Sequence, residues 1–200
     1  MLSFTNIAIS IIAYLLGSIP AALIVGRRLK GIDIRTIGNG NMGASNVFHT
    51  LGEKAGILVA VIDFLKGALP VLVATLLGFS VEWRMIVGAC AILGHDFPVF
   101  AGFRGGQGTA TTLGTMLILF PMQTLFGLIL YGSLFLITRN SRLSCGFGGG
   151  LIALLLGISQ QWLFFVYAIV AFLFIPLKLF MDTPRRRAIK ALQVKEILKS

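Results

Sequence analysis

Residues 55–79, AGILVAVIDFLKGALPVLVATLLGF, decide the fold class of this 200-residue chain. The run is long and apolar enough to cross a bilayer, which takes about 20 residues of helix. Only Asp63 and Lys66 interrupt it, and their spacing places both on one face of a helix. Charged side chains inside a membrane are costly and usually face the interior of a bundle, where they serve function. The stretch therefore predicts a spanning helix with an inward-facing ion pair; a purely structural pair that orients the helix is the alternative.

The composition of the whole chain is that of an integral membrane protein. Hydrophobic residues make up 56% and charged residues 12%, whereas a soluble domain carries about 25% charged residues. Two of the candidate spans, 109–120 and 143–158, are short, and we expect them to be tilted or buried among other helices. We therefore predict an all-α, polytopic membrane helix bundle with about seven spans in one domain over 1–182, followed by a basic tail over 183–200. The candidate spans are 4–25, 55–79, 82–101, 109–120, 122–138, 143–158 and 160–180.

The basic residues predict an orientation. A net charge of +10 could indicate nucleic-acid binding, but in a membrane protein cytoplasmic Lys and Arg explain it better. With seven spans, all of the 17 basic residues except Lys66 and Arg84 fall on one side or at a span end next to it. The N-terminus is therefore predicted outside and the C-terminus inside, with nucleic acid excluded as a partner. The tail is expected either to lie on the cytoplasmic leaflet through Ala191, Val194 and Leu198, or to be solvated.

Two glycine-rich segments fall on the predicted cytoplasmic side, GNGNMG at 38–43 and GGQG at 105–108. Glycine permits positive φ and close approach, so that successive N–H groups can cradle an anion. Asn side chains and Arg35 near the first segment add donors suited to phosphate, and the second segment leads into a helix N-terminus. The pattern predicts a phosphate site, with simple tight turns as the alternative. Although 38–43 matches GxGxxG, no βαβ unit surrounds it, so a dinucleotide site is excluded.

Four ordered segments resemble the signatures of the PlsY family of bacterial acyl-phosphate:glycerol-3-phosphate acyltransferases. They are GSIP at 17–20, DIRTIGNGNMGASN at 33–46, DFLKGALP at 63–70 and GHDFPVFAGFRGGQGTAT at 94–111. The resemblance implies transfer of a fatty acyl group from acyl phosphate to the 1-hydroxyl of glycerol-3-phosphate in the bacterial inner membrane. The product would be lysophosphatidic acid, and no cofactor or metal is implied. Because an acyl phosphate is already activated, positioning and neutralisation of charge would carry most of the rate.

The same resemblance implies roles for individual residues. Catalytic roles fall to Lys66, His95 and Asn46, although a lone His at a span end can also be an interfacial anchor. The acyl phosphate, glycerol-3-phosphate and membrane lipid are the expected partners. The substrate-binding residues are expected to be Arg35, Asn39, Asn41, Ser45, His49, Gly105, Gly106, Gln107, Gly108 and Arg139.

Several positions depart from the family pattern. A Ser of the family is Asn39 here, an Arg is His49, a Lys is Gln107 and a Ser is Cys145, and the family's C-terminal HxxNxxRL pattern is absent. A charge pair 4 Å apart is worth about 4 kcal/mol at an effective dielectric of 20, so the loss of two cations matters. Arg142 is a candidate to restore part of that charge. The alternative function is a non-catalytic member that binds a phosphorylated lipid or metabolite; a transporter is disfavoured because no internal repeat appears.

Overall fold

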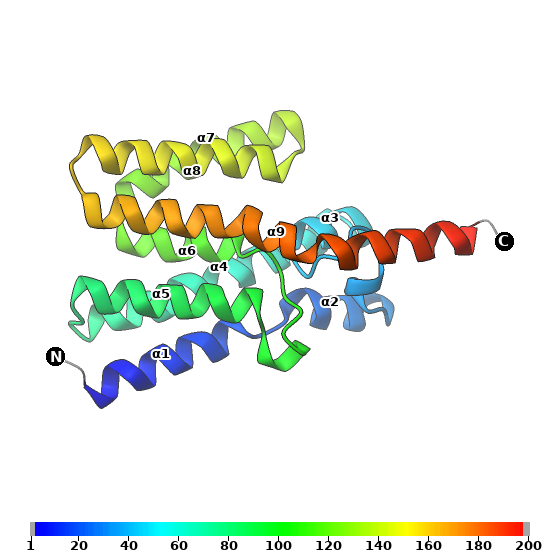
Figure 1. The fold of residues 1–200 in the computed structure, drawn as a ribbon, viewed down its shortest axis with the longest axis horizontal. Coiled ribbons are helices and arrows are strands. Elements are labelled where there is room, and N and C mark those ends of the chain that lie inside the picture. The colour runs from blue at the N-terminus through cyan, green and yellow to red at the C-terminus, as the bar shows by residue number, and fades with distance from the viewer. Residues whose placement is uncertain (1–2, 198–200) are drawn as a thin grey trace.

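Nine α-helices and two short 3₁₀ helices make up residues 3–197, the part of the chain that the computed structural model describes. No β-strand occurs within these residues, and the predicted all-α fold is confirmed. The long helices run back and forth between two ends of the molecule (Figure 1). In order, the elements are α1 (Phe4–Gly17), α2 (Ala21–Lys30), η1 (Ile34–Thr36), α3 (Ala44–Leu51), α4 (Glu53–Leu76), α5 (Val81–Asp96), η2 (Val99–Ala101), α6 (Thr109–Leu119), α7 (Pro121–Thr138), α8 (Ser141–Ile158) and α9 (Trp162–Ile197).

Six helical segments are long and apolar enough to cross a membrane, among the residues described. α6 has only 11 residues and spans about 16 Å at 1.5 Å per residue, too little for a full crossing. It packs against α4, α5, α7 and α9, and Thr111, Thr115 and Met116 are fully buried. The expected short span 109–120 is therefore a buried half-span. The six segments are Phe4–Lys30, Glu53–Leu76, Val81–Ala101, Pro121–Thr138, Ser141–Ile158 and Trp162–Leu192.

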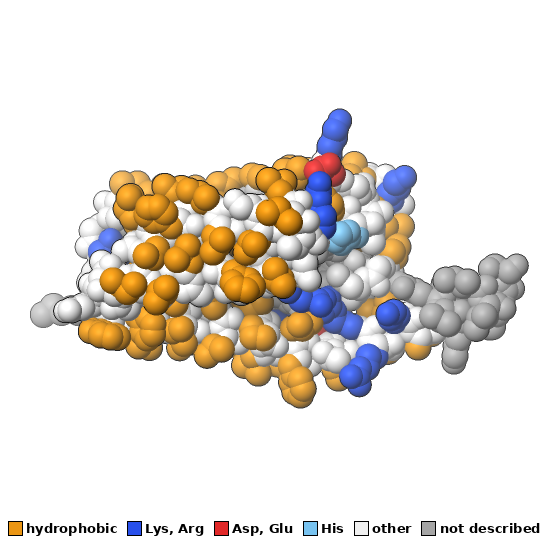
Figure 2. Space-filling model, turned by 90° about the horizontal axis from the view of Figure 1, so that it is seen from above, with side chains coloured by type: hydrophobic (Ala, Val, Ile, Leu, Met, Phe, Trp, Pro, Cys, Tyr) orange, Lys and Arg blue, Asp and Glu red, His pale blue; other side chains and the backbone are white. Residues whose placement is uncertain are grey.

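The visible surface has a large apolar region and a smaller region rich in Lys and Arg, as expected of a membrane protein (Figure 2). Figure 2 shows apolar side chains covering most of the visible helices, while most of the visible Lys and Arg side chains gather toward one end. This gathering matches the distribution of basic residues in the sequence. The predicted N-outside orientation itself stays a prediction.

The first expected span, 4–25, is divided in two. α1 ends at Gly17 and α2 begins at Ala21, because Pro20 lacks an N–H and disfavours a helical residue before it. The ammonium of Lys66 fills the break by donating to the carbonyl of Ile19 at 2.9 Å. α1 lies close against α5, and a methyl group on Gly17 would overlap the carbonyl of Ala91.

The expected boundary at 182/183 falls inside α9, which continues from Trp162 to Ile197 with Pro184 within it. Beyond the apolar part of this helix, Ile189 packs where a side chain on Gly40 would lie, and Arg186 bonds to the first glycine-rich loop. Leu198 of the expected apolar stripe lies outside the described residues, as does the side chain of Val194. Binding of the tail to the leaflet stays a prediction.

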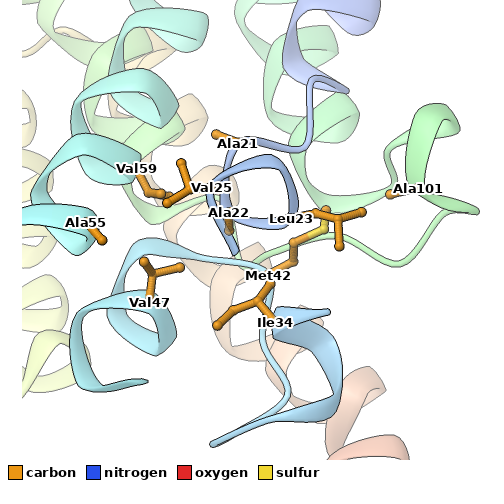
Figure 3. Close-up of a cluster of buried hydrophobic side chains, with 10 residues drawn as sticks. All are labelled: Ala21, Ala22, Leu23, Val25, Ile34, Met42, Val47, Ala55, Val59 and Ala101. Atoms are coloured by element: carbon orange, nitrogen blue, oxygen red, sulfur yellow. The ribbon is translucent and has the colours of Figure 1, made fainter. Parts of the chain in front are cut away.

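A buried apolar cluster fixes the first glycine-rich loop against the bundle. Its side chains come from α2, the segment between α2 and α3, α3, α4 and η2 (Figure 3). Ile34 and Val47 are fully buried in it. Burial of such side chains stabilises by about 1.5–3 kcal/mol each, so the cluster holds the backbone of the loop in place. Its members are Ala21, Ala22, Leu23, Val25, Ile34, Met42, Val47, Ala55, Val59 and Ala101.

Candidate active site

The two glycine-rich loops, distant in sequence, border two adjoining cavities. We name them the cationic cavity, of about 310 Å³, and the apolar cavity, of about 440 Å³. The wall of the cationic cavity includes Arg142 and Arg186. The apolar cavity is lined largely by apolar side chains such as Phe48, Phe64 and Leu128. Both volumes fall in the range of natural ligand sites. The residues that border both cavities are Asn41, Ser45, Gln107, Thr109 and Ser141.

Three helices begin at the junction of the two cavities. α3, α6 and α8 place Ser45, Thr109 and Ser141, respectively, in the walls of both cavities. The first N–H groups of a helix have no acceptor within it, and the terminus carries about +0.5 of a charge. The capping residues of α3 and α6 are Gly43 and Gly108, which leave these N–H groups without a side-chain partner. None of the described wall residues of the cationic cavity is Asp or Glu. The junction therefore suits an anion.

The predicted ion pair lies next to the apolar cavity and links three motifs. Lys66 Nζ lies 2.9 Å from Asp63 Oδ1, and His95 Nδ1 lies 3.5 Å from the same oxygen. On its other side the imidazole abuts Gly106, where a methyl group would overlap Nε2. Asp63 and His95 border the apolar cavity, whereas Lys66 borders neither. Lys66 thus holds Asp63 and the α1–α2 break rather than reaching a cavity.

Arg35 is engaged by protein groups. Its Nη2 lies 2.6 Å from Asp33 Oδ2, its Nε donates to Asp33 Oδ1 at 2.9 Å, and its Nη1 donates to the carbonyl of Ala101 at 3.0 Å. The hydrogen bond from Arg35 holds the pKa of Asp33 below its ordinary value, so the contact is lost only as pH falls through that lowered pKa. Arg35 borders neither cavity. It ties the segment before the first glycine-rich loop to the turn before the second.

Asn46 shapes the first glycine-rich loop from inside. Its Nδ2 donates to the carbonyls of Ile34, Ile37 and Asn41 at 2.9, 3.1 and 3.0 Å. Its Oδ1 accepts from the backbone N–H of Asn39 at 3.0 Å. The side chain is 1% exposed and borders neither cavity. The structure makes Asn46 a positioning residue for this loop.

Asn46→Ala is expected to lower the free energy of unfolding by about 2 kcal/mol, because buried backbone groups lose their partners. Denaturation of the purified protein in detergent measures this. Asn140→Ala is the matched control, since Asn140 is an exposed capping residue whose loss is expected to cost about 1 kcal/mol. Equal effects of the two substitutions would contradict the assigned role of Asn46.

The structure separates the sequence-predicted site residues into two groups. One group borders a cavity: Asn39, Asn41, Ser45, His49, His95, Gln107 and Gly108. The other borders neither: Arg35, Asn46, Lys66, Gly105, Gly106 and Arg139. Arg139 is an exposed residue with φ 52° at the end of α7, and Gly105 and Gly106 pack on His95. Within residues 3–197, no group of three or more His, Cys, Asp or Glu side chains could hold a metal ion.

Sequence reasoning missed some residues of the cavity walls. Thr109 and Ser141 carried a usable signal, because each opens a helix directly after a capping position. Arg186 carried none, because its place depends on α9 continuing past the apolar span. The missed wall residues with polar side chains are Thr109, Ser141 and Arg186 in the cationic cavity and Tyr131 in the apolar cavity.

The fold and the site define an integral membrane protein in which a cavity lined by two arginines adjoins a largely apolar cavity. The model of the glycerol-3-phosphate acyltransferase family matches residues 7–187. A glycerol-3-phosphate acyltransferase of Geobacter sulfurreducens is 45% identical over 134 residues, 67% of this chain and 69% of the relative. Another, of Endomicrobium trichonymphae, is 40% identical over 162 residues, 80% of this chain and 81% of the relative.

Two crystal structures of PlsY (YgiH), an integral membrane glycerol 3-phosphate acyltransferase, have the same fold. The glycerol 3-phosphate form superposes with a TM-score of 0.81 at 35% identity, covering 90% of this chain and 91% of PlsY. The lysophosphatidic acid form gives a TM-score of 0.78. The chain belongs to the glycerol-3-phosphate acyltransferase family, which confirms the resemblance seen in its motifs. It is a membrane acyltransferase of phospholipid synthesis.

Proposed function

We propose that this chain transfers a fatty acyl group from acyl phosphate to the 1-hydroxyl of glycerol-3-phosphate, releasing lysophosphatidic acid and phosphate. The observation that carries the proposal is the junction of the two cavities, where three helix N-termini meet. The apolar cavity would hold the acyl chain and the cationic cavity would hold glycerol-3-phosphate. The names of the relatives and the two ligand forms of PlsY support glycerol-3-phosphate as the acceptor.

Unpartnered polar atoms at the junction fit the acceptor. Asn41 Oδ1 and Gln107 Nε2 are buried and have no hydrogen-bond partner within residues 3–197. An unpaired buried polar group costs about 1–3 kcal/mol, so a bound ligand that satisfies both gains affinity. Asn41 Oδ1 can accept from a glycerol hydroxyl, and Gln107 Nε2 can donate to a phosphate or carbonyl oxygen.

In the proposed reaction, the hydroxyl oxygen attacks the carbonyl carbon of the acyl phosphate. A carbon–oxygen ester bond forms, the bond between the carbonyl carbon and the phosphate oxygen breaks, and phosphate leaves with that electron pair. The departing phosphate takes the hydroxyl proton. The free N–H groups at the starts of α3 and α6 would stabilise the developing negative charge.

His95 faces the apolar cavity and would position the acyl phosphate or handle a proton. Lys66 would act through Asp63, which lies between it and His95, and is thus a positioning residue. Gly105 and Gly106 would keep the imidazole in place.

The proposal is tested by incubating the purified protein with palmitoyl phosphate and labelled glycerol-3-phosphate. Labelled lysophosphatidic acid is expected in amounts that rise with protein concentration. Absence of product above a no-protein control, in lipid as well as in detergent, would remove the proposal. Palmitoyl coenzyme A in place of palmitoyl phosphate is the matched control for the donor and is expected to give no product.

We further propose that the cavities face the cytoplasm of a bacterial inner membrane. The gathering of basic residues near the end of the molecule that holds both glycine-rich loops supports this orientation. Fusions to the C-terminus report it: green fluorescent protein should fluoresce and alkaline phosphatase should be inactive. The reverse result would overturn the orientation.

A further inference from the structure

Arg142 stands in the wall of the cationic cavity at an electrostatically unfavourable position. It lies in the first turn of α8, where the positive end of the helix dipole repels a cation. Within residues 3–197 its guanidinium makes no ion pair and no hydrogen bond. Asn140 Oδ1 already accepts from the backbone N–H groups of Arg142 and Leu143, so the donors left without a partner at the start of α8 are those of the guanidinium, which suits a phosphate.

Arg186 reaches the same cavity from α9. Its Nε donates to the carbonyl of Asn39 at 2.9 Å, which fixes the side chain against the first glycine-rich loop. The nearby carboxylate of Asp182 is already bound by Lys178 Nζ at 2.8 Å and lies 3.5 Å from Arg185 Nη2. The terminal nitrogens of Arg186 are therefore free to bind a ligand.

Both guanidinium groups belong to the wall of one cavity, where two like charges repel each other. No described wall residue of the cationic cavity is acidic, and the starts of three helices add further positive potential there. Two cations in the wall of one cavity of about 310 Å³, with no carboxylate among the described wall residues, are suited to a small dianion. A phosphate monoester has this charge, and each arginine can bind it through two hydrogen bonds.

We propose that Arg142 and Arg186 bind the phosphate group of glycerol-3-phosphate and supply the charge that His49 and Gln107 do not. This inference rests on the proposed function for the identity of the ligand. Its consequence is that α9, up to the residues that pack on the first glycine-rich loop, belongs to the active site and is not a separate tail. The donor's phosphate, which must sit where the apolar cavity meets the junction, is assigned to the N–H groups of α3 and α6.

The test measures binding separately from turnover. The full chain in detergent is heated with increasing inorganic phosphate or glycerol-3-phosphate, and the rise in melting temperature gives the half-saturating concentration. Arg142→Gln and Arg186→Gln are each expected to raise that concentration for glycerol-3-phosphate roughly tenfold, and the double variant roughly 100-fold. Arg187→Gln is the matched control, because Arg187 is exposed on the same helix and borders neither cavity; it should bind as the wild type does.

Kinetics identify which phosphate is bound. The KM for glycerol-3-phosphate should rise in both single variants, while the KM for palmitoyl phosphate stays within about twofold. If only the KM for palmitoyl phosphate rises, the arginines bind the donor and the proposal is overturned. It is also overturned if neither anion stabilises the wild type, or if both single variants bind as Arg187→Gln does. Lost binding in the variants, together with a wild type that binds but does not turn over, would support the site while removing the proposed reaction.

Arg186→Lys tests whether the loss of binding in Arg186→Gln is a purely structural effect. It keeps the charge and loses the planar fork, so its half-saturating concentration should fall between those of the wild type and Arg186→Gln. The guanidinium of Arg142 makes no hydrogen bond within residues 3–197, so loss of binding in Arg142→Gln cannot arise from a released loop.

Discussion

Lys66→Met is expected to lower the free energy of unfolding by about 3–5 kcal/mol and to abolish acyl transfer. The substitution leaves Asp63 buried without its ammonium partner, and removal of one member of a buried pair carries a penalty of that size. It also removes the donor to the carbonyl of Ile19, 2.9 Å away, which stabilises the break between α1 and α2. Unfolding by denaturant in detergent micelles measures the loss. Lys54→Met is the matched control on the same helix, because Lys54 is exposed, and it should change stability by less than about 0.5 kcal/mol.

A double variant separates structure from chemistry. Asp63→Leu combined with Lys66→Met removes both charges, and replacement of a buried pair by apolar side chains is often neutral or stabilising. Stability should therefore return to within about 1 kcal/mol of the wild type. Activity should stay low, because His95 loses the carboxylate that lies 3.5 Å from its Nδ1. Full recovery of activity would show that the pair is structural only.

The chain of helices was largely predictable because hydropathy and length act locally. Residues 55–79 read as one span, and α4 occupies Glu53–Leu76. The spacing of Asp63 and Lys66 likewise predicted their contact, since residues three apart share a helix face. Hydropathy could not place the end of α9, because a helix does not stop where its apolar face stops. The basic run after residue 182 indicated a change of environment, and the backbone continues through it.

The candidate site was predictable as a place but not as a set of contacts. Glycine-rich segments at 38–43 and 105–108 predicted a phosphate site on one side of the membrane, and Asn41 and Gln107 from these segments border the same two cavities. Polar side chains in loops satisfy backbone groups as readily as they bind ligands, and sequence does not distinguish the two uses. The side chains of Asn46 and Arg35 donate to backbone carbonyl groups. Arg186 could not be foreseen, because its position depends on contacts between parts of the chain that are remote in sequence.

Gly106→Ala is expected to lower kcat/KM roughly 100-fold or more while the protein stays folded. A methyl group there would overlap His95 Nε2, and the loop cannot retreat freely because the N–H of Gly106 donates to the carbonyl of His95 at 3.2 Å. The imidazole must therefore move, and a displacement of about 1 Å in a catalytic arrangement can cost about 100-fold in rate. Gly150→Ala is the matched control, since Gly150 is exposed and its added methyl would meet nothing within 4 Å.

Combining Gly106→Ala with His95→Gln tests whether the glycine acts through the imidazole. If it does, the double variant should be no less active than His95→Gln alone, because both changes disturb the same group and their effects do not add. Multiplied losses in the double variant would instead mean that the glycine serves the substrate directly, through the loop backbone. In that case His95 and the second glycine-rich loop would be independent parts of the site, and the contact between them would be a matter of packing alone.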